Sequence, residues 1–220
     1  MTVKKALSDL MKGRFVLIHD SLGMENEVDM AIAGEKIKPE DVARLRTDGG
    51  GLICVALSKQ IARRLKLPFI QEVYKRSNME IFKALKADDI PYDEKSAFSL
   101  TINHRKTFTG ITDKDRALTI REFALLCKKP SLRKFGKKFR TPGHVHLLIS
   151  AGIEKRKGHT ELSTKLAKMA GLTGVMAICE MMDGKTKKAL SLEKSGKYAR
   201  KNNLTLIDSK QILEYVRGVR

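Results

Sequence analysis

The sequence has no tryptophan, few tyrosines and only three cysteines among its 220 residues. Cys54, Cys127 and Cys179 lie in apolar runs, and no pair of them has the spacing of a metal site or a redox motif. This usage favours a reducing compartment, so we expect a cytoplasmic protein. No apolar run reaches the ~18 residues that span a membrane. Residues 1–11 lack the apolar centre of a secretory signal, so no membrane contact is expected.

Acidic residues are also scarce. Asp and Glu number 25 against 44 Lys and Arg, which gives a formal net charge of +19. Such an excess can attract nucleic acid or small phosphorylated anions. The basic residues are nevertheless dense only in residues 128–140, and aromatic side chains that could stack on bases are rare. A solvated basic surface is favoured and nucleic acid is not an expected partner, although a nucleic-acid-binding protein stays open as an alternative.

The order of apolar runs predicts a layered α/β fold. Short buried strands are expected over residues 15–18, 30–33, 52–57, 98–102, 145–149, 174–179 and 204–207. Helical patterns lie between them, over residues 39–46, 59–65, 114–128, 160–170 and 190–202, with a last helix from Ser209. Residues 72–95 are polar enough to form a flexible excursion. No linker divides the chain, so a single domain over residues 1–220 is expected.

Three carboxylates alternate directly after the first predicted strand. In an extended chain Glu25, Glu27 and Asp29 would share one face, where like charges repel and raise one another's pKa values. A hard divalent cation bound through oxygen atoms would relieve that repulsion. The alternative is a solvated acidic loop.

Two further segments carry residue types suited to catalysis. Pro142-Gly143 predicts a tight turn before a strand that His144 enters, and a histidine there could act as a general acid or base. Glu180 is a lone carboxylate that follows an apolar run. A core histidine satisfied by backbone groups is the alternative interpretation of His144.

A phosphate site is predicted where residues 156–161 lead into a helix. Gly158 allows close approach of the backbone, Arg156 and Thr160 supply donors, and a helix start presents free N–H groups. Arg156 is expected to be exposed, so that its loss would leave no buried group unpaired. The alternative is a plain basic turn.

Five segments in this order resemble the 3,4-dihydroxy-2-butanone-4-phosphate synthase family: Glu25–Met30, Gly110–Arg116, Arg140–Val145, Arg156–Glu161 and Cys179–Glu180. The resemblance implies a layered α/β/α sandwich around a mixed sheet. It also implies a lyase of riboflavin biosynthesis that converts ribulose 5-phosphate to 3,4-dihydroxy-2-butanone 4-phosphate and formate. The implied cofactor is Mg²⁺ or Mn²⁺, with two ions per substrate-bound site, and the implied assembly is a homodimer. A monofunctional form is implied because the chain ends at Arg220, without a fused second enzyme domain.

The resemblance also assigns roles to residues. The implied metal ligands are Glu25 and His159, and the implied catalytic residues are Glu27, Asp29, His144 and Glu180. The implied substrate-binding residues are Glu25, Thr112, Asp29, Arg156, Lys157, Gly158, His159, Thr160 and Glu180. The chain departs from the family at Met24, where an arginine is usual, and at Leu22, where an acidic residue is common. Another metal-dependent sugar-phosphate isomerase or aldolase remains an alternative, since enediol chemistry is shared.

Overall fold

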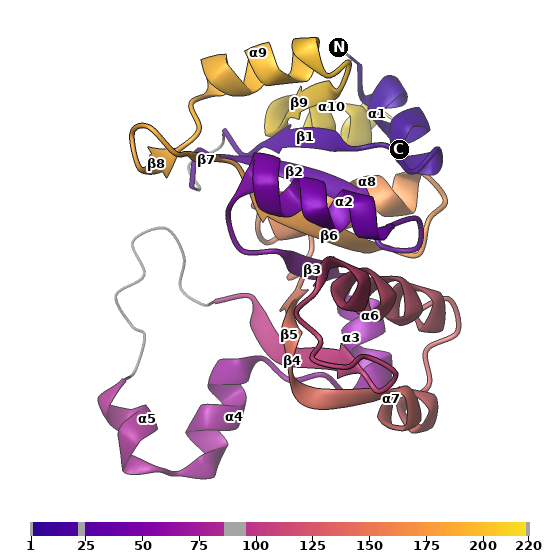
Figure 1. Ribbon diagram of the computed structural model, residues 1–220, viewed down its shortest axis with the longest axis vertical. Coiled ribbons are helices and arrows are strands. Elements are labelled where there is room, and N and C mark those ends of the chain that lie inside the picture. Colours follow the sequence, from indigo (N-terminus) through magenta and orange to yellow (C-terminus); the bar gives the residue numbers. More distant parts are fainter. Residues whose placement is uncertain (1, 22–24, 86–95, 219–220) are drawn as a thin grey trace.

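A mixed sheet of seven strands forms the centre of the computed structural model, which describes residues 2–21, 25–85 and 96–218 (Figure 1). The strand order is β4-β5-β3-β6-β2-β1-β9. Only the β5–β3 and β1–β9 pairs are parallel. The strands are β1 (Val16–His19), β2 (Val28–Ala33), β3 (Cys54–Leu57), β4 (Phe98–His104), β5 (Phe139–Ile149), β6 (Val175–Glu180) and β9 (Thr205–Asp208).

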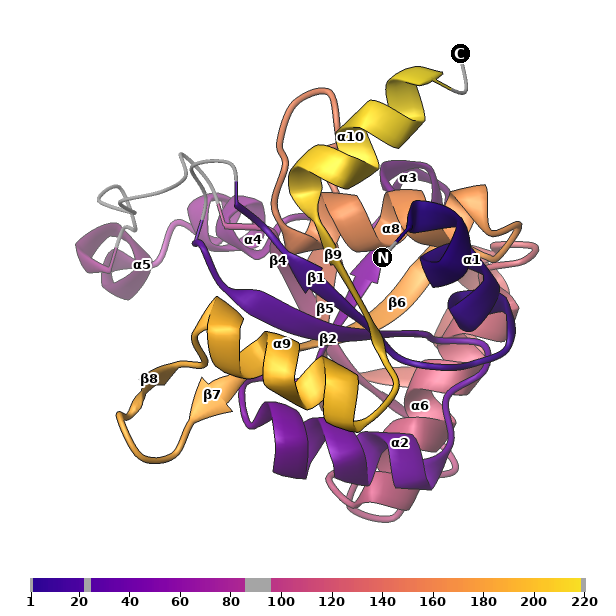
Figure 2. The same cartoon turned by 90° about the horizontal axis from the view of Figure 1, so that it is seen from above.

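Helices cover both faces of this sheet (Figure 2). One face packs against α1 (Val3–Met11), α8 (His159–Met169) and α10 (Ser209–Gly218). The other packs against α2 (Pro39–Arg44), the π-helical turn η1 (Leu45–Gly49), α3 (Lys59–Leu65), α6 (Asp113–Leu126), α7 (Leu132–Lys138) and α9 (Leu192–Lys201). The remaining elements are α4 (Ile70–Ser77), α5 (Glu80–Ala84) and the two-stranded ribbon of β7 (Met182–Asp183) and β8 (Lys188–Ala189). The expected layered α/β/α architecture with a mixed sheet is therefore confirmed.

The central strands are apolar on both faces because helices cover both. Successive residues of a strand point to opposite faces, so Leu17 joins one core cluster and Ile18 the other. Met30 and Ala31 divide between the clusters in the same way. No helix in the described part of the chain is long and apolar enough to cross a membrane.

Several helix ends follow the sequence signals. The Ser58 side chain caps α3 by accepting from the backbone N–H of Ile61, and Gly171, at φ +70°, follows the end of α8. Helix α6 begins one residue before the expected position 114, because Thr112 caps it by accepting from the Asp115 N–H and Asp113 is its first residue.

The turn predicted at Pro142-Gly143 is also wrong. Both residues lie inside β5, at a register shift where the neighbouring strand passes directly from Ile102 to Asn103. A side chain at position 143 would place its Cβ atom 2.0 Å from the carbonyl carbon of Ile102, so the chain needs glycine there. The strand can absorb the extra residues as a bulge, which sequence periodicity does not reveal.

Four helices were not predicted. The expected excursion over residues 72–95 contains most of α4 and all of α5, neither of which has a buried residue, and residues 86–95 lie outside the described part. The N-terminal helix α1 and the short helix α7 were also missed. Both carry many lysines, but α1 buries an apolar side against the sheet.

We predict that Ile120→Ala lowers the free energy of unfolding by about 2–5 kcal/mol, because it leaves a cavity where α6 meets the sheet. Ile120 is fully buried, whereas Leu125 on the same helix is 40% exposed. Leu125→Ala therefore serves as the matched control and should cost less than half as much. Urea denaturation measures both, and equal losses would contradict the packing described here.

Candidate active site

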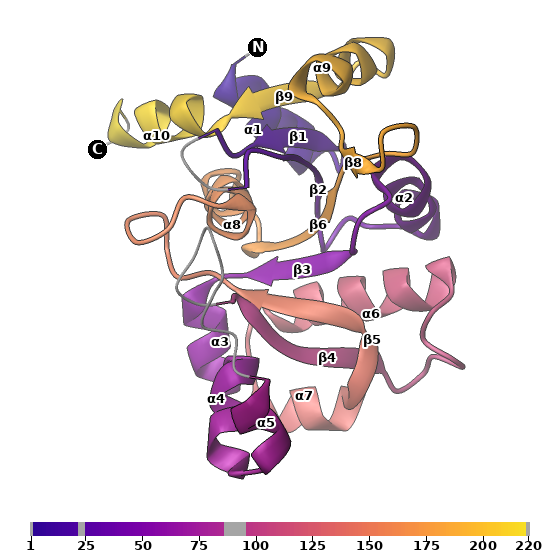
Figure 3. The same cartoon turned by 90° about the vertical axis from the view of Figure 1, so that its left-hand side faces the viewer.

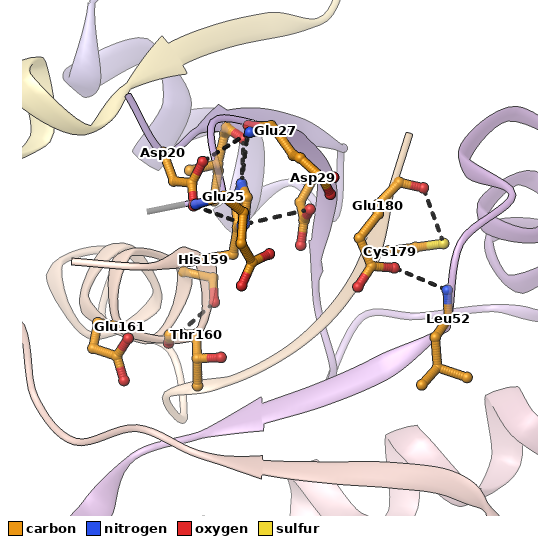
Figure 4. A network of polar contacts seen from close by, with 12 residues as sticks. Asp20, Glu25, Glu27, Asp29, Leu52, His159, Thr160, Glu161, Cys179 and Glu180 are labelled. Atoms are coloured by element: carbon orange, nitrogen blue, oxygen red, sulfur yellow. Dashed lines mark hydrogen bonds and ion pairs between the residues drawn. The ribbon is translucent and has the colours of Figure 1, made fainter. Parts of the chain in front are cut away.

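Carboxylates lie close together where three adjacent strands of the sheet begin or end (Figure 4). Asp20 directly follows β1, Asp29 lies at the start of β2 and Glu180 is the last residue of β6. The sheet register pairs Asp29 with Ile18 on one side and with Glu180 on the other. The antiparallel pairing thus brings a strand start and two strand ends together, which produces an acidic cluster.

His159, the first residue of α8, lies against this cluster with 5% of its surface exposed. Its Nε2 atom lies 3.2 Å from the carbonyl oxygens of both Ile18 and Glu27. Carbonyl oxygens only accept hydrogen bonds, so Nε2 carries a proton and donates. Nδ1 faces Asp20 Oδ2 at 3.6 Å and Asp29 Oδ1 at 3.5 Å. A metal-binding histidine is commonly oriented by a hydrogen bond from one ring nitrogen while the other nitrogen binds the ion. Here Nε2 makes the orienting contacts, which leaves Nδ1 for a cation.

Ligand atoms of Asp20, Glu25 and His159 all lie within 4.8 Å of one another. Asp20 is completely buried, and its two oxygens accept the backbone N–H groups of Glu27 at 2.9 Å and Glu25 at 3.2 Å. Asp29 Oδ1 is buried and has no hydrogen-bond partner among the described residues. Oxygen atoms of this kind beside an imidazole nitrogen fit a divalent cation.

The prediction that Glu25, Glu27 and Asp29 share one face of an extended chain is wrong. Asn26 adopts a left-handed conformation, φ +57°, so Glu25 and Glu27 do not extend β2. The Asn26 Oδ1 atom lies 3.0 Å from Nε2 of His19, whose Nδ1 atom is 3.4 Å from Asp208 Oδ2. The acidic loop is therefore shaped by contacts with β1 and β9 rather than by strand pairing.

Sequence reasoning missed two residues of this site, Asp20 and His19. The one available signal was that polar residues directly follow a buried strand, where α/β sites often lie. Met24 and Leu22, where the sequence departs from the family pattern, lie outside the described residues.

Burial and like charge change the acidity of the cluster. Burial raises the pKa of Asp29 to about 8, although nearby His159 opposes the change. Burial also raises the pKa values of Glu25 and Glu27. For His159, burial favours the neutral form, but the carboxylates of Asp29, Asp20 and Glu25 outweigh it and raise the pKa. The cluster therefore holds protons near neutral pH that a bound cation would displace.

Arg156 joins the predicted phosphate loop to the acidic cluster. Its Nη1 atom donates to Glu161 Oε2 at 3.0 Å, and its Nη2 atom lies 3.6 Å from Glu25 Oε1. The Arg156 side chain is 16% exposed and Glu161 is fully buried. The expectations that Arg156 is exposed and that its loss would leave no buried group unpaired are therefore wrong. A Cβ atom at position 158 would lie 2.3 Å from Arg156 Nη1, so a larger residue than Gly158 would displace the guanidinium.

The other predicted residues of this loop differ in exposure. Thr160 is buried and Lys157 is exposed. Glu180, partly exposed, accepts the backbone N–H of Leu52 through Oε2 at 2.8 Å, which directs its carboxylate toward β3. Its charge contributes to the raised pKa of Asp29, so the two carboxylates interact electrostatically across the strand pair.

No contact joins His144 or Thr112 to the acidic cluster in the described part of the chain. The His144 N–H donates to Asn103 Oδ1 at 2.9 Å, so the amide nitrogen of Asn103 faces the ring and donates to Nδ1 at 3.1 Å. Nδ1 is thus the acceptor, and the neutral ring carries its proton on Nε2. Thr112 is exposed and caps α6.

We predict that, without metal, the free energy of unfolding falls as pH rises from ~5 to about 8. Over that range the unfolded chain has lost the Asp29 proton that the folded chain retains, so the folded state loses its advantage. The raised pKa of His159 acts in the same direction. Asp29→Asn should flatten this dependence, as measured by urea denaturation at a series of pH values.

Asp113→Asn is the control for that series. Arg46 lowers the pKa of Asp113, so its proton leaves both the folded and the unfolded chain before this pH range is reached. The control should therefore keep the wild-type slope above pH ~5. A wild-type slope in Asp29→Asn as well would show that the Asp29 carboxyl is not held protonated by the fold.

Comparisons with known proteins agree with this geometry. A family model described as 3,4-dihydroxy-2-butanone 4-phosphate synthase matches residues 4–215. The 3,4-dihydroxy-2-butanone 4-phosphate synthase of Methanothermobacter thermautotrophicus is 47% identical over 216 residues, which cover 96% of this chain and 94% of that protein. That of Archaeoglobus fulgidus is 46% identical over 225 residues, which cover 99% and 94%.

The fold also matches solved structures. A crystal structure of 3,4-dihydroxy-2-butanone 4-phosphate synthase in complex with two magnesium ions gives a TM-score of 0.81 at 26% identity, covering 99% of this chain and 97% of that one. The enzyme of Candida albicans gives 0.78 at 28% identity, covering 98% and 97%. Sequence, fold and the clustered acidic residues lead to the same assignment: the chain belongs to the 3,4-dihydroxy-2-butanone 4-phosphate synthase family.

Proposed function

We propose that this chain is a lyase that converts D-ribulose 5-phosphate to L-3,4-dihydroxy-2-butanone 4-phosphate and formate in riboflavin biosynthesis. The observation that carries the proposal is the contact between the potential metal ligands and the predicted phosphate loop. Glu25 belongs to the group of potential metal ligands and also faces Arg156, a potential phosphate ligand. One substrate that carries both a hydroxyketone and a phosphate would therefore meet both groups.

Glu25 and His159, together with Asp20, would hold the divalent cation, Mg²⁺ or Mn²⁺. When bound, the cation would act as a Lewis acid that stabilises negative charge on substrate oxygens. Two ions per site are proposed, because a related synthase crystallised in complex with two magnesium ions. The carboxylate of Asp29, whose Oδ1 atom lacks a hydrogen-bond partner in the described structure, is available nearby.

The chain's own part in the reaction is proton transfer. A proton must leave the carbon beside the ketone, and the later loss of water, carbon shift, rehydration and release of formate each move further protons. Glu27, Asp29 and Glu180 are the proposed acid–base groups of the cluster. Asp29 lies against His159 and has a buried Oδ1 atom without a hydrogen-bond partner in the described structure, so its carboxylate is free to accept a proton in general acid–base catalysis.

The substrate phosphate is proposed to bind Arg156, Gly158 and Thr160 at the start of α8, with Lys157 beside them. Glu161 keeps the Arg156 guanidinium in place, since it binds Nη1 while its other oxygen accepts the Ala151 N–H at 2.8 Å. Such preorganisation favours recognition of a phosphate, because less side-chain entropy is lost on binding.

We propose that His144 acts across the interface of a homodimer. Its ring is held by Asn103, and no contact in the described residues joins it to the acidic cluster of its own chain. Phe108 is 93% exposed and Ile111 is 50% exposed in the adjoining loop, and exposed apolar side chains of this kind favour association with a second copy. Thr112, in the same loop, would then reach the partner's substrate. Cytoplasmic localisation remains part of the proposal.

We predict that the purified chain releases formate from ribulose 5-phosphate when Mg²⁺ is present, and that a chelator abolishes the release. A formate dehydrogenase assay measures the product, and elemental analysis confirms removal of metal. Isomerases and aldolases do not release formate from this substrate, so conversion without formate would favour that alternative. Salt-dependent binding of RNA without turnover would favour the nucleic-acid alternative.

We predict that Arg156→Met raises the KM for ribulose 5-phosphate at least about tenfold, since a charge-assisted contact contributes about 1.5–3 kcal/mol. The single change also leaves the buried Glu161 carboxylate without its cation, which should cost about 3 kcal/mol of folding stability. Adding Glu161→Gln removes that charge while keeping an acceptor for the Ala151 N–H, so the double variant should regain stability and keep the high KM.

Lys155→Met is the control, because Lys155 is an exposed cation on the same loop. It should change neither stability nor KM appreciably. Steady-state kinetics and urea denaturation test the three variants together. A wild-type KM in the stable double variant would count against Arg156 as a phosphate ligand.

A further inference from the structure

A cavity of about 570 Å³ lies between α3, α8 and the loop that follows β5. None of the potential metal ligands lines it. Glu161 does, so the cavity shares one wall with the Arg156 loop. Its volume falls within the ~300–1,000 Å³ typical of small-molecule sites. Figure 3 shows β3 pointing toward the side of the molecule where α3 and the loop before α8 lie.

The cavity lies at the carboxyl ends of two neighbouring parallel strands. β3 and β5 are paired up to Leu57 and Ile149, and the next residues, Ser58 and Ser150, line the cavity. The Ser150 N–H donates to the Leu57 carbonyl at 3.0 Å, which holds the two strand ends together. Ligands of open α/β sheets commonly bind beyond the carboxyl ends of parallel strands.

The charge of this cavity is strongly positive. Five cationic residues and two acidic ones, Glu154 and Glu161, line it; the cations are Lys59, Arg63, Arg64, Lys165 and Lys168. Within the described residues, none of the five makes an ion pair or a hydrogen bond through its side chain. Both oxygens of Glu161 are already engaged, by Arg156 and by the Ala151 N–H. The five cations therefore repel one another across the cavity and outnumber its two carboxylates, of which Glu161 is already engaged.

Two buried hydroxyl groups add directed donors. Ser58 is 5% exposed and accepts the Ile61 N–H, and Ser150 is 4% exposed and accepts the Gly152 N–H. Neither hydroxyl donates to another residue in the described part of the chain. Each keeps its proton for a further acceptor, which the cations require to be anionic.

We propose that this cavity binds a small molecule with two or more phosphate groups, at a site separate from the one that binds the substrate. Phosphate oxygens accept hydrogen bonds from both serine hydroxyls and pair with cations from α3 and α8. Several phosphates are needed because the five cations come from two helices rather than from one point. The lining contains no aromatic side chain on which a base could stack, so nucleic acid is not the expected ligand.

Isothermal titration calorimetry with inorganic pyrophosphate tests the proposal, using the whole chain in metal-free buffer at about 0.15 M salt, where distant exposed charges are screened. The variant Arg63→Gln/Lys165→Gln should weaken binding at least about tenfold. Ser150→Ala removes one donor and no charge, and should weaken binding by about tenfold as well.

The matched control is Arg200→Gln/Lys201→Gln, which also removes one arginine and one lysine, from exposed positions on α9, a helix on the opposite face of the sheet from α8. It should bind pyrophosphate like the wild type. Equal weakening in the control would show general attraction to a basic protein, and undiminished binding in the cavity variants would place the anion at the Arg156 loop. Either result, or an absence of binding to the wild type, would overturn the proposal.

Discussion

The position of His159 between two buried carboxylates is the interaction on which the site depends. Its Nε2 donates to the carbonyls of Ile18 and Glu27, so the start of α8 is tied to both β1 and the loop that enters β2. Its Nδ1 faces Asp20 and Asp29, which come from those same two elements. One imidazole ring thus fixes the helix to the sheet and presents a nitrogen atom to the acidic cluster.

The cost of burying these carboxylates explains the arrangement of the cations around them. An isolated buried carboxylate is strongly unfavourable unless it is protonated, paired or bound to metal. The described residues provide the first two of these solutions, together with backbone hydrogen bonds. Asp29 has a pKa of about 8 and is protonated below it, Glu25 faces Arg156, and the Asp20 oxygens accept backbone N–H groups beside His159. A divalent cation would displace the protons and neutralise the negative charge of these carboxylates.

Local sequence patterns predicted most of the fold and part of the site. Strand and helix positions follow from periodicity and from caps such as Ser58, because these signals depend on neighbouring residues. The bulge at Gly143 and the left-handed Asn26 could not be predicted, since each is set by a contact with a distant strand. Resemblance to a family identified His159 and Glu25, whereas Asp20 has no motif of its own beyond its place after a strand.

The low exposure of the Arg156 side chain shows that the charge of a residue does not by itself predict how far it is exposed to solvent. The side chain of an arginine just before a helix is expected to extend into solvent. The Arg156 side chain instead donates to Glu161, a carboxylate in the first turn of α8. Glu161 also lines the basic cavity, and later residues of the same helix, including Lys165, supply that cavity with cations. Helix α8 therefore serves the acidic cluster through its first residue and the basic cavity through its next turns. Both carboxylate oxygens of Glu161 are engaged by Arg156 and the Ala151 N–H, so this side chain offsets the charge of Arg156 and leaves the charge of Lys165 and the other cations of the cavity in place.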